Sequence, residues 1–96
     1  MGFGVPAAIG AALAEPDRTV VCFTGDGSFK MNIQELATLA EEGLNVKIVL
    51  MNNNSLGLVY QQQNLFYGKR VFASKYRGEP DFLKIAEGFG LPAERV

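Results

Sequence analysis

The chain has 96 residues, of which 48% are hydrophobic, and a formal net charge of -1, so it can form one domain or part of one but not two. Neither charge is in large excess, which argues against a nucleic-acid-binding protein. With no histidine and a single cysteine, Cys22, the chain lacks the usual zinc ligands and general base and cannot form an internal disulfide. These features favour a cytoplasmic protein in which a cofactor carries any chemistry.

The apolar opening of the chain, Met1 to Ala14, has neither the basic start of a signal peptide nor an uninterrupted apolar core. Glu15 and Asp17 end this stretch before it reaches the length of a membrane span. We therefore expect neither secretion nor membrane insertion.

Two elements are predicted before residue 25. Pro6 suits the first turn of a helix, Ala7 to Ala14 are mostly strong helix formers, and Pro16 stops the element. Thr19 to Thr24 is a run of β-branched and aromatic residues, which is typical of a strand buried on both faces. The strand ends at the turn sequence Gly25-Asp26-Gly27.

The next helix is predicted to begin near Ile33, because apolar residues follow at helical spacing. Asn32 and Glu35 are spaced as a capping box, and Gly43 is placed to end the helix. Val46 to Met51 then resembles a second buried strand, so that strand, helix and strand form a βαβ unit with parallel strands.

The remainder of the chain is predicted to add two helices. Leu56 to Tyr67 is the first, and it lies within a segment, residues 43 to 78, that contains no acidic residue. The four basic residues in the second half of this segment fit either a solvated face or a lid near an anionic substrate. Asp81 is predicted to cap the second helix, which Gly90 ends, and Leu91 to Val96 resembles the approach to another strand.

The fold class that follows is α/β: a partial doubly wound parallel sheet with a βαβ core and flanking helices. Residues 1–96 would form part of one domain. In such sheets ligands bind at the carboxyl ends of the strands, which is where Gly25-Asp26-Gly27 and Asn52-Asn53 stand.

These two strand-end motifs offer the oxygen ligands that magnesium accepts. Asp26 supplies an anionic carboxylate and Asn53 a neutral amide oxygen, and the glycines beside Asp26 permit close approach of a phosphate. Each motif alone is more often a simple turn. Together, at neighbouring strand ends, they are much more specific for a site that binds a phosphate through a metal.

The spacing of the two motifs, with 24 residues between Gly27 and Asn52, resembles the signature of thiamine-diphosphate enzymes. The wider sequence resembles the large catalytic subunit of acetolactate synthase (acetohydroxyacid synthase) along essentially its whole length. The residues that carry this resemblance lie in four stretches: Met1 to Ala8, Gly25 to Phe29, Met31 to Leu36 and Val46 to Ile48. The resemblance implies a fragment of the thiamine-diphosphate-binding fold of the C-terminal domain in a larger enzyme.

The resemblance also implies roles for individual residues. The magnesium ligands would be the side chains of Asp26 and Asn53 and the backbone carbonyl of Ser55. Other positions would contact the thiamine diphosphate: Met1, Gly25, Gly27, Ser28, Gly57 and Leu58. No catalytic residue is expected in this segment, because the activating glutamate and the FAD-binding domain of the family lie elsewhere.

Gln62 stands where many acetolactate synthases carry a tryptophan that lines the substrate and herbicide site. The surrounding Gln61-Gln62-Gln63 resembles the bacterial isozyme I branch of the family. The implied reaction is decarboxylation of pyruvate and condensation with a second 2-keto acid, in branched-chain amino-acid biosynthesis. The implied partners are the remaining domains of the same chain, a second copy in a homodimer or tetramer, and a small regulatory subunit.

Two alternatives to this interpretation stay open. Another thiamine-diphosphate decarboxylase or carboligase, such as glyoxylate carboligase or oxalyl-CoA decarboxylase, would share the metal motif. A non-catalytic α/β binding module would keep the fold without the chemistry, although retention of Asp26 and Asn53 argues against loss of the metal site.

Overall fold

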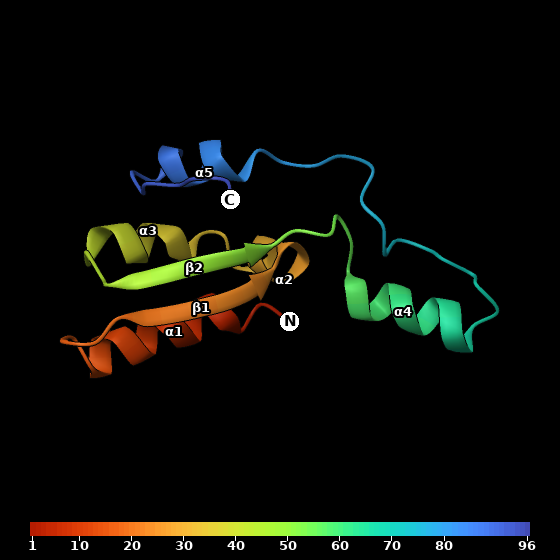
Figure 1. Cartoon of the computed structure of the whole chain (residues 1–96), viewed down its shortest axis with the longest axis horizontal. Coiled ribbons are helices and arrows are strands. Elements are labelled where there is room, and N and C mark those ends of the chain that lie inside the picture. Colours follow the sequence, from red (N-terminus) through yellow and green to blue (C-terminus); the bar gives the residue numbers. More distant parts are fainter.

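Two parallel strands form the centre of the structure, a computed structural model that describes residues 1–96 (Figure 1). Strand β1 (Val20–Gly25) pairs with strand β2 (Val46–Met51). Their register places Val20 opposite Val46 and Gly25 opposite Met51. The predicted α/β class and both strands are confirmed, with β1 shifted by one residue, and the two strands end at the same edge of the sheet.

Five helices accompany the strands. They are α1 (Gly4–Ala14), α2 (Asp26–Met31), α3 (Glu35–Glu41), α4 (Gly57–Phe66) and α5 (Phe82–Gly88). Helix α1 packs against β1 and α3. The apolar residues of α5 pack against the hydrophobic core that these elements form. Helix α4 lies apart from the others, beyond the carboxyl ends of the strands, and a long connection returns from it to α5 (Figure 1).

The core lies on one face of the sheet, between the strands and helices α1, α2 and α3. Its nine buried residues are Val5, Ala8, Ile9, Ala12, Cys22, Phe29, Leu36, Leu39 and Val46. The small residues of α1 permit a close approach: a Cβ on Gly4 would lie only 3.4 Å from the Sγ atom of Cys22. Burial raises the pKa of this thiol, as expected for a cysteine that acts as a small hydrophobic side chain.

The prediction that β1 is buried on both faces was wrong for this chain. Val21 is 51% exposed and Phe23 is 72% exposed, and Met51 on the neighbouring strand is 61% exposed. The reason is that the helices of these 96 residues cover only the face that carries Cys22 and Thr24. The opposite face of the sheet is left as an apolar row.

We expect this apolar row to make the isolated 96-residue chain self-associate. Sedimentation velocity should show species larger than the monomer at micromolar concentration. Replacing Phe23 with Ser should shift the distribution towards monomer, whereas replacing Leu13, a 55% exposed residue of α1 outside the row, should not. A monodisperse wild-type monomer would contradict the expectation.

The helix predicted near Ile33 starts two residues later, and its capping box does not form. Helix α3 begins at Glu35, and no side chain caps its first turn. The side-chain amide of Asn32 instead donates a hydrogen bond to the carbonyl of Gly2. A contact distant in sequence therefore replaces the local cap, which no local pattern could reveal. The predicted end of this helix is confirmed, because Gly43 adopts a φ of +59°.

The last helix agrees with its prediction at both ends. The Asp81 carboxylate accepts hydrogen bonds from the backbone N–H groups of Leu83 and Lys84, both at 3.2 Å, and Gly90 has a φ of +77° beyond the last turn. The segment from 91 to 96 forms no strand in this structure. No helix of the chain combines the length and the apolar character needed to span a membrane.

Candidate cofactor-binding site

The carboxylate of Asp26 lies directly at the carboxyl end of β1. Gly25 is the last residue of the strand, and Asp26 is the first residue of the short helix α2, which the sequence patterns had not predicted. Asp26 is only 2% exposed, which is unusual for an acidic residue. A carboxylate this far removed from solvent is placed to interact with a positive charge.

The segment after β2 folds as a tight turn around asparagine side chains. The Asn53 Oδ1 atom accepts hydrogen bonds from both the backbone N–H and the hydroxyl of Ser55, each at 3.1 Å, and the Asn52 Oδ1 atom accepts one from the N–H of Asn54. An amide oxygen has two lone pairs, and both are engaged at Asn53. A metal ion bound to this oxygen would therefore have to displace one of the Ser55 donors, of which the rotatable hydroxyl is the easier.

Residues 74–76 run antiparallel beside this turn. The N–H of Leu56 donates to the carbonyl of Ser74 at 2.8 Å, and the N–H of Tyr76 donates to the carbonyl of Asn54 at 3.2 Å. Gln63 of α4 holds the same segment through its side-chain oxygen, which accepts from the Ser74 hydroxyl. Ser74 is fully buried, so the segment packs closely against α4 and the turn.

Two predicted contact glycines lie close against neighbouring side chains. A Cβ on Gly27 would stand 2.6 Å from both the Leu56 Cδ2 atom and the Tyr76 hydroxyl. A Cβ on Gly57 would stand 2.8 Å from the Asn53 Nδ2 atom. A side chain at either position would therefore require these neighbouring side chains to move aside.

Tyr76 is a residue of the site that the sequence patterns did not single out. The Lys30 ammonium lies 3.1 Å from the centroid of its ring, a cation–π contact. Burial, and then the nearby carboxylate of Asp26, raise the pKa of the Tyr76 phenol above its usual value, so it is neutral at pH 7. The only signal in the sequence was its place in the basic segment without acidic residues.

The first residues of the chain pack against α2. The Ser28 hydroxyl accepts a hydrogen bond from the N–H of Gly2 at 2.8 Å, and Gly2 has a φ of +79°. The neighbouring Met1 side chain is 75% exposed. The structure thus brings Met1, Ser28 and the turn at Asp26 into one region, with the Ser28 oxygen engaged by the backbone.

A cavity of about 550 Å³ opens beside the turn that follows β2. It is lined by Asn53, Asn54, Ser55, Gly57, Tyr60, Lys75 and Tyr76. Three predicted contact positions, Asn53, Ser55 and Gly57, therefore share one hollow. Leu58 and Gln62 are exposed on α4 and do not line it.

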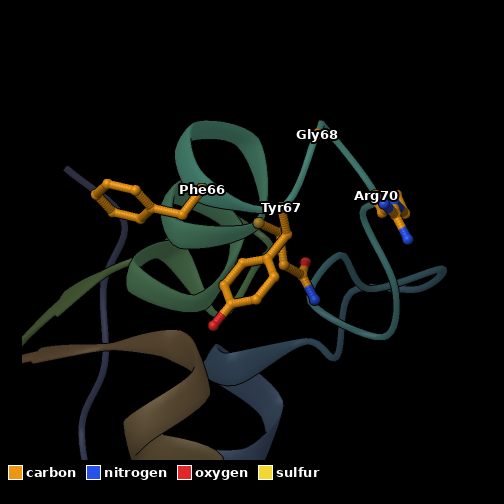
Figure 2. Close-up of a pocket in the computed structure, with 5 residues that line it drawn as sticks. Phe66, Tyr67, Gly68 and Arg70 are labelled. Atoms are coloured by element: carbon orange, nitrogen blue, oxygen red, sulfur yellow. The ribbon is translucent and has the colours of Figure 1, made fainter.

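A second cavity, of about 430 Å³, lies at the end of α4 (Figure 2). Its lining residues are Gln63, Phe66, Tyr67, Gly68 and Arg70. In Figure 2 the side chains of Phe66, Tyr67 and Arg70 point in different directions. They do not converge on a common point, and Gln62 is not among them.

The donor set at the strand ends suits one kind of metal. The chain has no group of three or more histidine, cysteine or acidic side chains that could hold an ion. What the site offers is one carboxylate, one amide oxygen and backbone carbonyls. Such hard oxygen donors fit Mg²⁺, which binds proteins through one or two carboxylates and completes its shell with phosphate oxygens and water.

Asp26 and Asn53 follow the ends of two neighbouring parallel strands, and comparison with known proteins shows which family has this arrangement. Residues 1–96 match the family described as "Thiamine pyrophosphate enzyme, C-terminal TPP binding domain", and the chain belongs to this family. The structure superposes with a TM-score of 0.87 on the thiamine diphosphate-dependent 4-hydroxybenzoylformate decarboxylase of Rhodococcus jostii RHA1. That protein is 36% identical, and the match covers 96% of this chain and 17% of the other.

Within this class, the chain is similar to acetolactate synthases. It is 67% identical to the isozyme 1 large subunit of Escherichia coli K12 over 91 residues, which cover 95% of this chain and 16% of that one. It is 55% identical to a probable acetolactate synthase large subunit of Methanococcus aeolicus over 96 residues, 100% of this chain and 16% of the other. The isozyme 2 large subunit of E. coli K12 is 49% identical. The chain spans about a sixth of the length of these relatives.

Proposed function

We propose that this chain is the part of an acetolactate synthase large subunit that holds the diphosphate of thiamine diphosphate through Mg²⁺. The observation that carries the proposal is the 67% identity to the isozyme 1 large subunit over 95% of the chain. The higher identity to isozyme 1 than to isozyme 2 supports the isozyme I branch. The full-length protein would decarboxylate pyruvate and condense the product with a second 2-keto acid, in branched-chain amino-acid biosynthesis.

In this proposal the residues at the strand ends have separate tasks. Asp26, Asn53 and the Ser55 carbonyl hold the metal ion, and Asp26 supplies the only negative charge among them. Gly25, Gly27, Ser28, Gly57 and Leu58 approach the diphosphate, and Met1 packs against the cofactor. Thiamine diphosphate supplies the chemistry by acting as an electron sink for decarboxylation, while the protein positions it and excludes water.

The full-length protein would also contain what these residues do not provide. We propose that the rest of its chain supplies the activating glutamate and an FAD-binding domain. It would assemble as a homodimer or tetramer, with a small regulatory subunit as a further partner. By itself the 96-residue segment would be inactive, and a cytoplasmic location fits the reaction.

A purified full-length protein tests this function directly. With pyruvate alone it should form acetolactate, and removal of metal by EDTA should abolish the activity until Mg²⁺ and thiamine diphosphate are added back. Activity with glyoxylate or oxalyl-CoA, but not with pyruvate, would favour the alternative enzymes. Metal-independent acetolactate formation would contradict the proposed site.

A further inference from the structure

Tyr76 contacts both of the segments that carry the proposed metal ligands. Its backbone N–H donates to the carbonyl of Asn54, between the proposed ligands Asn53 and Ser55. Its hydroxyl lies against Gly27, the residue after Asp26, where a Cβ would be 2.6 Å away. One residue therefore spans the ends of both strands.

The aromatic ring of Tyr76 strengthens this connection on the side of α2. The Lys30 ammonium, one helical turn beyond Asp26, lies 3.1 Å from the ring centroid. The segment that contains Tyr76 is in turn held by α4. The Gln63 side chain donates a hydrogen bond to the Phe72 carbonyl at 2.9 Å and accepts one from the Ser74 hydroxyl. The position of Tyr76 is thus fixed by its backbone hydrogen bond to Asn54 and by the contact of its ring with Lys30.

A metal ion held from two segments needs those segments at a fixed separation. The pairing of β1 with β2 ends at Gly25 and Met51, so the sheet does not fix the residues beyond it. Tyr76 connects the two segments at this point. Replacing a group that orients metal ligands without touching the metal typically lowers the affinity of the site for the metal by about 10- to 100-fold.

We propose that Tyr76 is a positioning residue that sets the separation of the Asp26 and Asn53 segments and so determines the affinity of the site for Mg²⁺. This inference depends on the proposed function, since it assigns a role within the same site. Tyr76 lies outside both strand-end motifs, in the segment that returns from α4 towards α5.

The test is a Mg²⁺ titration of the full-length protein at saturating thiamine diphosphate, read as cofactor binding by equilibrium dialysis and as activity. Tyr76→Ala should raise the Mg²⁺ concentration for half-saturation by about 10-fold, while the rate at saturating Mg²⁺ changes much less. Tyr76→Phe keeps the ring on Lys30 but loses the hydroxyl beside Gly27, so its affinity for Mg²⁺ should lie between those of the wild type and Tyr76→Ala. Where the Ala variant does not fold, Tyr76→Leu, which keeps apolar bulk but cannot reach Gly27 and Lys30 together, should show the same weakening.

Phe72→Ala is the matched control, because this aromatic residue belongs to the same segment and its side chain is 84% exposed. It should leave the affinity for Mg²⁺ unchanged. Wild-type affinity in Tyr76→Ala, or in Tyr76→Leu if that variant replaces it, would overturn the role of Tyr76. A wild-type protein that needs neither Mg²⁺ nor thiamine diphosphate would instead overturn the proposed function itself.

Discussion

Replacing Asp26 with Ala should weaken binding of Mg²⁺ and thiamine diphosphate by the full-length protein by more than about 100-fold, because loss of a ligand costs more than loss of an outer-shell partner. Asp26 is the only anionic group in the proposed ligand set, and it is only 2% exposed, so neither another carboxylate nor bulk water can readily replace it. Isothermal titration with the cofactor at fixed Mg²⁺ measures the change.

Asp17→Ala provides the control for this variant, since Asp17 is an exposed acidic residue in the turn between α1 and β1. It should bind the cofactor like the wild type. Removal of a buried carboxylate can also alter folding, so circular dichroism should show that the Asp26→Ala variant keeps its secondary structure. A well-folded Asp26→Ala protein with unchanged cofactor affinity would rule out the metal assignment.

The elements of this fold could be predicted wherever local chemistry determines them. The β-branched run before Gly25 and the run from Val46 to Met51 became strands, and Asp81 caps α5 as its spacing to the apolar residues indicated. The edge of the sheet that carries Asp26 and Asn53 also followed from the sequence. Parallel strands in a βαβ unit must end on the same side.

Contacts between residues distant in sequence could not be predicted in this way. Asn32 was expected to cap α3, but its amide binds the carbonyl of Gly2. Helix α2 was missed because Gly25-Asp26-Gly27 has the composition of a turn, and its six residues are too few to show helical periodicity. Tyr76 reaches the site only because residues 74–76 pair with the turn after β2, and a single bridge of this kind has no signature in the sequence.

Gln62→Trp should increase the preference of the full-length enzyme for 2-ketobutyrate over pyruvate as acceptor. The two acceptors differ by one methylene, which a hydrophobic wall can reward with about 1–3 kcal/mol, or roughly 10- to 200-fold. Tryptophan would provide such a wall, whereas glutamine has less apolar surface and a polar end that favours hydration. The wild type should therefore discriminate weakly, and it should resist inhibitors that stack on tryptophan.

The structure provides a sharp control for this variant. Gln62 is exposed on α4 between Leu58 and Leu65, which are 69% and 65% exposed, so a tryptophan there would extend an apolar stripe of the helix. Gln61 is also exposed, but it flanks the stripe on the opposite edge, about 100° around the helix from Gln62, so a tryptophan there would point in a different direction. Competition between the two keto acids should therefore change the product ratio in Gln62→Trp and not in Gln61→Trp. Equal ratios in the wild type and in Gln62→Trp would mean that this stripe does not face the acceptor, because a wall that touches the extra methylene must alter the ratio.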